Sequence, residues 1–227
     1  MALILHIDTA LDAASICLAR GEQVLATAEN ARRQDHAAWL QPAIRALLDG
    51  EGLKPASLEA VAVTAGPGSY TGLRIGMATA KGLCYALNLP LITVSTLEVL
   101  AAAAWADAPP ADLVCPMVDA RRQEVFTAVY DRELREVMTP TAMVLSEPGF
   151  SELLDTHTVL FTGNGSPKFE AMTRSPRALF KSIHLQAALL VKFSHKRFHE
   201  KQFADLAYAE PLYIKEFYTT SPKTPFR

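Results

Sequence analysis

A glycine-rich stretch, TAGPGSYTGLRIG at residues 64–76, constrains the fold of this chain more than any other feature. An aliphatic run precedes it and a segment with helical spacing follows it, so we expect a strand, a tight turn and a helix over residues 69–88. Turns of this kind at helix N-termini often hold phosphate. The two common phosphate-binding patterns fail, because no lysine follows Gly72 and because Gly72 stands one residue too late after Gly66 and Gly68. The turn is therefore either a phosphate site or a purely structural connection.

The predicted helix carries small residues on one face. Gly72, Gly76 and Ala80 recur every four residues, and each glycine inside a helix costs roughly 1 kcal/mol relative to alanine. Close approach of another backbone would offset this cost. The approaching helix lies either in the same chain, at residues 36–48, or in another chain, and we favour another chain.

Composition limits the classes of protein to which the chain can belong. Half of its 227 residues are hydrophobic, which is enough for a sizeable core. Lys and Arg (22) nearly balance Asp and Glu (24), whereas a free-standing nucleic-acid-binding domain normally has a basic excess. The start, MALILHIDTA, predicts a first strand rather than a signal peptide, and no apolar run has membrane-spanning length. Three widely spaced cysteines without CxxC fit a reducing cytosol. We therefore expect a cytoplasmic protein without a membrane segment.

Strand and helix signals alternate along the chain. SICLAR and QVLATAE predict a hairpin that turns at Gly21, and residues 35–48 predict a helix that Pro42 either starts or kinks. LITV predicts a strand, and STLEVLAAAAWA predicts a helix that Ser95 or Thr96 caps. Three more strands, LVCPMVD, EVFTAVY and TVLFTG, and the helical run QAALLVKFSHKRF follow.

This order of elements predicts an α/β architecture in two lobes, each with a mixed sheet and flanking helices. We expect the first lobe at residues 1–106, a linker of composition DAPPAD at 107–112 and a smaller second lobe at 113–205. Residues 206–227 are expected to form an extended or irregular tail.

Several blocks of the sequence resemble one family: ILHIDTA with Ser15, AVTAGPGSYTGLRIGMATAKGL, PLITVSTLE, MVDARRQEVFTAVY and AEPLYIK. They are similar to the bacterial TsaB (YeaZ) family of tRNA threonylcarbamoyladenosine biosynthesis proteins, densely over residues 1–130 and again at 210–215. The resemblance implies the ASKHA fold, the two-lobed architecture of actin, sugar kinases and Hsp70. It also implies a non-catalytic subunit that works beside the catalytic relative TsaD, the ATPase TsaE and a threonylcarbamoyl-adenylate synthase. Together these proteins modify the adenosine next to the tRNA anticodon.

The metal-ligand positions of the catalytic relative agree with a non-catalytic role. In that relative, the helix after the strand that matches LITV carries H-x-x-x-H, two metal ligands one turn apart. Thr96 and Leu100 stand at those positions here, and a leucine cannot ligate a metal. Transfer chemistry that needs a metal as a Lewis acid therefore has no site there. We expect no cofactor on this chain, and ATP or ADP and metal on partner subunits or at a shared interface.

The phosphate-binding turns of ASKHA enzymes are altered as well. The turn that opens the second lobe is DARRQE, without glycine, and its arginines are either solvated or attract phosphate by charge. Asp8 matches the catalytic aspartate of the first strand and is expected to be a relic that hydrogen-bonds the Thr9 or Ser15 turn. We interpret the following residues as vestigial phosphate loops: Asp8, Thr9, Gly66, Gly68, Ser69, Asp119 and Arg121.

The resemblance also implies where partners bind. TsaB proteins pair with TsaD, and with a second copy of themselves, through first-lobe helices that correspond to residues 36–48 and 70–87. The groove of small residues indicates the same helices. We therefore expect the partner interface at Leu40, Ile44, Leu47, Gly72, Leu73, Gly76, Met77, Ala80 and Leu83. Contact with tRNA would come only through the complex.

Three smaller features and two other functions remain open. KFSHKRFHEK at 192–201 is a solvated basic face or a weak tRNA contact, and TGNGSPKF at 162–169 is a plain turn or an adenosine-contacting turn. Asp35 is expected to be an N-cap and His36 to lie at the surface or at an interface. An autonomous ASKHA ATPase or phosphotransferase is motivated by Asp8 and the glycine loop. A metallopeptidase is motivated by a label that relatives have carried, but the missing H-x-x-x-H argues against it.

Overall fold

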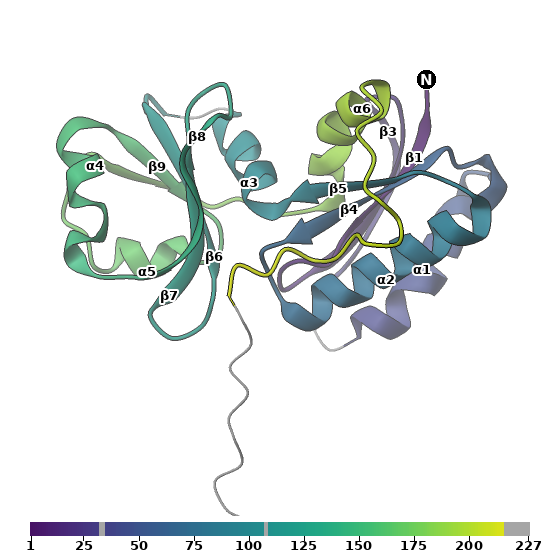
Figure 1. Ribbon diagram of the computed structural model, residues 1–227, viewed down its shortest axis with the longest axis horizontal. Helices are drawn as coiled ribbons and strands as arrows, with labels where there is room; N and C mark the ends of the chain where they lie inside the picture. Colours follow the sequence, from purple (N-terminus) through teal and green to yellow (C-terminus); the bar gives the residue numbers. More distant parts are fainter. Residues whose placement is uncertain (32–34, 107–108, 216–227) are drawn as a thin grey trace, which may run out of the picture.

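The fold is described by a computed structural model that places residues 1–31, 35–106 and 109–215. Within these residues, the strands form two five-stranded sheets, one in each lobe (Figure 1). The first sheet contains β1 (Leu3–Asp8), β2 (Ala14–Arg20), β3 (Gln23–Asn30), β4 (Ala60–Gly66) and β5 (Leu91–Ser95). The second contains β6 (Leu113–Asp119), β7 (Glu124–Tyr130), β8 (Glu136–Val144), β9 (Val159–Thr162) and β10 (Ala178–Lys181).

Helices connect and cover the strands (Figure 1). The α-helices are α1 (His36–Gly50), α2 (Tyr70–Leu87), α3 (Thr96–Trp105), α4 (Ser151–Thr156), α5 (Ser166–Glu170) and α6 (Val191–His199). Three short 3₁₀ turns complete the set: η1 (Pro55–Ser57), η2 (Glu147–Phe150) and η3 (Ala187–Leu190). Among the residues that the structure describes, no helix is long and apolar enough to cross a membrane.

The two sheets have the same topology. The strand order is β3-β2-β1-β4-β5 in the first and β8-β7-β6-β9-β10 in the second. In each sheet the central strand, β1 or β6, pairs antiparallel with the strand that follows it and parallel with β4 or β9 on its other side. The prediction of two α/β lobes with mixed sheets is therefore confirmed.

Helices α1 and α2 cover one face of the first sheet. Residues of β1 alternate between the two faces: Leu5 and Ile7 pack beneath these helices, whereas Ile4 packs on the opposite side. The helices contribute Leu40, Ile44, Leu47, Leu48, Met77, Ala80 and Cys84 to this core. His36 at the start of α1 is also buried within this chain, so the prediction that it lies at the surface or at an interface is wrong. Asp35 holds the N-cap position without a side-chain capping bond.

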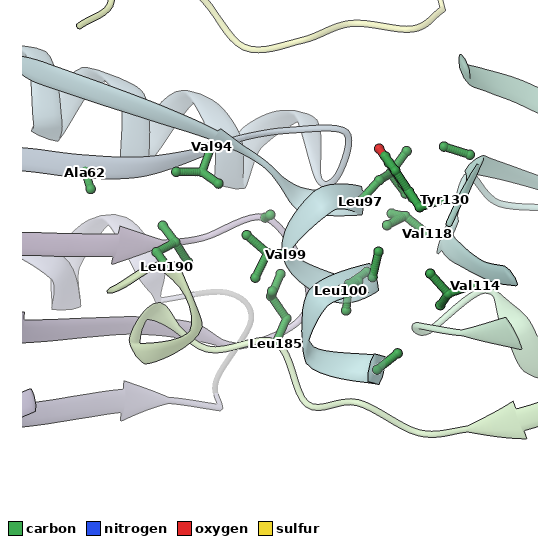
Figure 2. Close-up of a cluster of buried hydrophobic side chains, with 14 of the residues drawn as sticks. Ala62, Val94, Leu97, Val99, Leu100, Val114, Val118, Tyr130, Leu185 and Leu190 are labelled. Carbon is green, nitrogen blue, oxygen red and sulfur yellow. The ribbon is translucent and has the colours of Figure 1, made fainter. Parts of the chain in front are cut away.

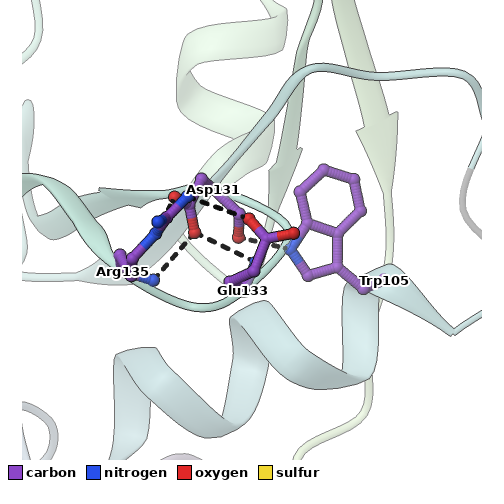
Figure 3. A network of polar contacts seen from close by, with 4 residues as sticks. All are labelled: Trp105, Asp131, Glu133 and Arg135. Carbon is purple, nitrogen blue, oxygen red and sulfur yellow. Dashed lines mark hydrogen bonds and ion pairs between the residues drawn. The ribbon is translucent and has the colours of Figure 1, made fainter.

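Helix α3 lies between the two sheets and joins the lobes in one core (Figure 2). Its Leu97 and Leu100 pack in the same cluster as Val94 of the first sheet and Val118 of the second. The C-terminal end of α3 also contacts the second lobe, because Trp105 donates its indole N–H to the carbonyl of Asp131 at 3.0 Å. Figure 3 shows this contact beside the turn in which Asp131 pairs with Arg135 at 2.7 Å. The two lobes are thus packed together through α3.

The chain returns to the first lobe after β10, so the predicted second lobe of residues 113–205 is wrong at its C-terminal end. Ala187 and Val191 pack against Cys17 and Ala19 of β2, and Ser194 Oγ lies 2.7 Å from Nε2 of His6. These residues cover the face of the first sheet that α1 and α2 leave open. The physical reason is burial: without η3 and α6, that apolar face would contact water.

The predicted linker and tail lie partly outside the described residues. Of the linker at 107–112, residues 107–108 are not described, and the strand β6 begins directly after it. Residues 206–215 have no regular secondary structure, as the tail prediction requires, and 216–227 lie outside the described part.

Candidate functional site

The glycine-rich loop joins β4 to α2 at the cleft between the lobes. Gly66 ends β4 with a φ of 107°, a conformation that favours glycine. Ser69 is the N-cap of α2, and its hydroxyl accepts a hydrogen bond from the Gly72 N–H at 3.3 Å. Asn88 ends the helix in the left-handed conformation. The predicted strand, turn and helix are therefore confirmed at this position.

The small face of α2 receives the turn that follows β1. A Cβ atom on Gly72 would lie 2.1 Å from the Thr9 carbonyl oxygen, and one on Gly76 would lie 2.3 Å from Thr9 Oγ1. A Cβ atom on Gly68 would lie 2.3 Å from the Ala10 carbonyl oxygen. The Thr9 hydroxyl also donates to the Gly72 carbonyl at 2.7 Å. These glycines are explained by close approach of a segment of the same chain.

The predicted partner interface is therefore wrong for nearly all of its residues. Eight of its nine members are buried within the first lobe: Leu40, Ile44, Leu47, Gly72, Leu73, Gly76, Met77 and Ala80. Leu83 is half-buried. The sequence pattern located the buried face of α1 and α2 correctly, but that face packs on the sheet of its own chain.

The outer face of α2 presents a different set of residues. Ala78 and Gly82 are exposed, and Tyr85 is 84% exposed. A Cβ atom on Gly82 would meet nothing within 4 Å, so no contact in the described chain explains this helix glycine. The helical spacing of these three residues places them on one side of α2. Glycine in a helix interior costs free energy, and contacts with Thr9 explain this cost at Gly72 and Gly76. At Gly82 the cost has no such explanation within the described chain.

Asp8 is buried at the end of β1. Its Oδ1 accepts hydrogen bonds from the Thr64 hydroxyl at 2.7 Å and from the Ala10 N–H at 3.2 Å. Its Oδ2 has no hydrogen-bond partner among the described residues. Burial raises the pKa of Asp8 to about 6, and the bond from Thr64 opposes this shift. The expected contact with the turn after β1 is present through Ala10, and the bond from Thr64 is an addition.

The turn between β6 and β7 holds arginines in a backbone conformation that glycine normally adopts. Arg121 and Arg122 have φ values of 71° and 52°. Asp119 accepts the Arg121 N–H at 2.6 Å and forms an ion pair with Lys168 at 2.6 Å. Two long side chains therefore occupy a turn whose backbone conformation favours glycine.

The glycine-rich loop and the turn between β6 and β7 face each other across a cavity of about 460 Å³. The turn after β1, the N-terminus of α2 and the turn between β6 and β7 line it, and Asn164 completes the wall. Asn164 belongs to the turn at 162–169, for which the sequence leaves a plain turn and an adenosine-contacting turn open, and its side chain accepts the Asp119 N–H at 2.9 Å. The structure therefore brings Gly68, Ser69, Asp119 and Arg121 to one cavity. Asp8 and Thr9 lie behind its lining.

Thr96 and Leu100, which the family resemblance implies stand at the metal-ligand positions of the catalytic relative, lie in the core. Leu100 is fully buried between the sheets, and Thr96 is buried at the start of α3 (Figure 2). Their helix is capped by Ser95, whose hydroxyl accepts the Glu98 N–H. Within the described residues, no group of three or more His, Cys, Asp or Glu side chains could hold a metal ion.

The basic stretch at 192–201 forms most of α6. Arg197 pairs with Glu98 at 2.7 Å, and the rings of His195 and His199 are 4.4 Å apart. Lys192 and Lys196 are exposed. The stretch thus has a structural role through Arg197, and its exposed lysines remain open to the two interpretations made from the sequence.

Comparisons with known proteins agree with this architecture. The model of the TsaD family, tRNA N6-adenosine threonylcarbamoyltransferase, matches residues 23–210. The tRNA threonylcarbamoyladenosine biosynthesis protein TsaB of Bacillus subtilis (strain 168) is 35% identical over 173 residues, which cover 74% of this chain and 74% of that protein. TsaB of Escherichia coli (strain K12) is 39% identical over 130 residues, which cover 57% of this chain and 55% of that protein.

Solved structures show the same fold. A Pseudomonas aeruginosa protein described as similar to peptidase YEAZ superposes with a TM-score of 0.81 at 27% identity, over 95% of this chain and 100% of that chain. The activator of 2-hydroxyisocaproyl-CoA dehydratase from Clostridium difficile, solved with bound ADPNP, superposes with a TM-score of 0.51 at 12% identity. This match covers 88% of this chain and 97% of the activator, and it bears on the fold alone.

Two sheets of the same topology around an interlobe cleft form the ASKHA fold, and this fold defines the class of protein. Within that class, the family model covers most of the chain and the Bacillus relative aligns over three quarters of it. The chain belongs to the TsaB (YeaZ) family of tRNA threonylcarbamoyladenosine biosynthesis proteins, within the wider TsaD family.

Proposed function

We propose that this chain is a non-catalytic subunit of the complex that makes N6-threonylcarbamoyladenosine at position 37 of tRNA. In this proposal it binds and activates the catalytic relative TsaD, together with the ATPase TsaE, in the cytoplasm. The resemblance to TsaB proteins supports it. The burial of Leu100 where the catalytic relative has a metal ligand supports it as well.

The observation that carries the proposal is the outer face of α2, defined by Ala78, Gly82 and Tyr85. Gly82 costs roughly 1 kcal/mol in a helix interior, and no contact in the described chain requires it. Tyr85 beside it is a large, almost fully exposed aromatic side chain, a type enriched at protein interfaces. A helix of another subunit that packed on this face would approach the α2 backbone at Gly82 and bury Tyr85. We therefore move the proposed interface to this outer face.

The interface is tested by mixing the chain with TsaD of the same organism and measuring complex mass by light scattering. Gly82→Arg places a long side chain in open space, so the subunit should fold while the complex dissociates. Tyr85→Ala should weaken binding about tenfold or more, as truncation of a central aromatic anchor does. Val144→Arg is the matched control, because Val144 is 66% exposed on the second lobe. An unchanged heterodimer with Gly82→Arg would place the interface elsewhere.

The same proposal puts nucleotide and metal on partner subunits or at a shared interface, and tRNA contact in the assembled complex. The cavity of about 460 Å³ favours one alternative, an autonomous ATPase. A calorimetric titration of the isolated chain with Mg-ATP separates the two. A flat titration is expected for the non-catalytic subunit, and micromolar binding would favour the ATPase.

A further inference from the structure

The C-terminal segment crosses from the first lobe to the second, and the proposed function leaves it unexplained. After α6, the Ala204 N–H donates to the Leu91 carbonyl at 2.8 Å, and Lys81 bonds the carbonyl of Ala209 at 2.9 Å. The Leu212 N–H then donates to the Ala65 carbonyl at 2.7 Å, beside the glycine loop. Figure 1 shows this yellow segment running past α2 to the gap between the lobes.

Residues 210–215, which we call the latch, contact both lobes. On the first lobe, the Tyr213 ring centroid lies 5.5 Å from that of Tyr70, and the Tyr213 hydroxyl accepts a hydrogen bond from Arg74 at 3.1 Å. On the second lobe, Lys215 forms an ion pair of 2.6 Å with Glu124 at the start of β7. The latch therefore links the end of β4 and the first turns of α2 to the start of β7, through the Leu212 backbone and the side chains of Tyr213 and Lys215.

The latch also lines a second cavity. This cavity, of about 360 Å³, is lined by the glycine loop, by the turn between β6 and β7 and by Leu212 to Lys215. It shares Gly68, Tyr70 and Arg121 with the cavity of about 460 Å³ described above. Both cavities lie between the lobes, so a change in the separation of the lobes changes both of them.

The latch has few buried contacts. Its ion pair is partly open to water, with the Lys215 and Glu124 side chains 44% and 16% exposed. Tyr213 is 38% exposed. Elements with few buried contacts open at low free-energy cost. Two-lobed proteins move by hinge closure about their connections, and a contact that bridges the cleft opposes such motion.

We propose that residues 210–215 are a latch that sets the separation of the lobes, and that its release opens the cleft occupied by the two cavities. Tyr213 holds the latch on the first lobe, and the pair of Lys215 and Glu124 holds it on the second. The inference does not depend on the proposed subunit function, because it concerns the isolated chain.

The separation of the lobes is measured by pulsed electron paramagnetic resonance between spin labels on Glu51→Cys and Glu170→Cys. Both positions are exposed, one on each lobe, and the three native cysteines are buried. Hydrogen exchange of the Leu212 amide reports release of the latch in the same protein. Both measurements are made on Tyr213→Ala, Lys215→Met, Glu124→Gln and the double variant of the ion pair.

Each single variant should broaden the label distances and speed Leu212 exchange about two- to fivefold, the range of a partly exposed ion pair. The double variant should add nothing to either single variant of the pair, because both remove one interaction. Lys201→Met is the control, because it removes the same charge from an exposed position outside the latch. Faster exchange with unchanged label distances would overturn the proposal, as would additive effects in the double variant.

Discussion

At the scale of single residues, Asp8 is a buried carboxyl group at the end of β1. It is fully buried, and its pKa is raised to about 6 because burial disfavours the carboxylate. The neutral form is therefore favoured more in the folded state than in the unfolded chain, and it predominates below about pH 6. The stability that this form contributes is fully present below the ordinary pKa of 3.8 and is lost as the pH rises through about 6.

Asp8→Asn should remove this loss. The amide keeps an oxygen acceptor for Thr64 and Ala10, and it does not ionise. Relative to the parent protein, the variant should gain up to about 3 kcal/mol of unfolding free energy between pH 4 and pH 7.5. Denaturant unfolding of both proteins at several pH values measures the difference, and burial of His6, whose pKa is lowered to about 4, affects both proteins alike. A constant difference across the pH range would contradict the assignment.

At the scale of elements, α2 shows how far a periodic pattern can be interpreted. The spacing of Gly72, Gly76 and Ala80 marks the close-packed side of the helix, and the structure puts Thr9 against it. Strand β8 was missed because Pro140 interrupts its sequence. Proline is tolerated there because β8 is the edge strand of the second sheet. Position in the sheet, which a local pattern does not report, decided this element.

Alanine at two glycines of α2 should have opposite effects on stability. Gly72→Ala places a Cβ atom 2.1 Å from the Thr9 carbonyl oxygen, and it should lower the unfolding free energy by about 1–3 kcal/mol despite the better helix propensity. Gly82→Ala meets no atom within 4 Å and should raise it by about 1 kcal/mol. Thermal unfolding of the isolated chain measures both. If both substitutions change the unfolding free energy by the same amount, contact with Thr9 does not explain why residue 72 is glycine.

At the scale of the whole molecule, each sheet is covered by a helix that lies next to the other sheet in the sequence. Helix α3 follows the first sheet in sequence, yet it packs between both sheets (Figure 2). Helix α6 follows the second sheet, yet it packs on the first through Val191 and Ser194. A cut at the predicted linker would therefore leave one sheet face of each lobe without its cover.

Fragments 1–106 and 113–227, made separately, should lack the cooperative thermal transition of the intact chain. The first loses Ala187 and Val191 from its core, and the second loses α3 from the face that carries Val118. Circular dichroism during heating measures this for each fragment and for their equimolar mixture. A fragment that melts cooperatively near the midpoint of the intact chain would show that its lobe is independent.

The sequence by itself determined the two α/β lobes, most strands and helices, and the glycine turn with its Ser69 cap. These follow from local spacing, capping and backbone preference, which act over a few residues. Only the tertiary structure decided what covers each buried face. A periodic pattern shows that Gly72, Gly76 and Leu40 are buried, but burial against the chain's own sheet and burial against a partner leave the same pattern. Gly82, Tyr85 and the latch became visible only once the contacts within the chain were known.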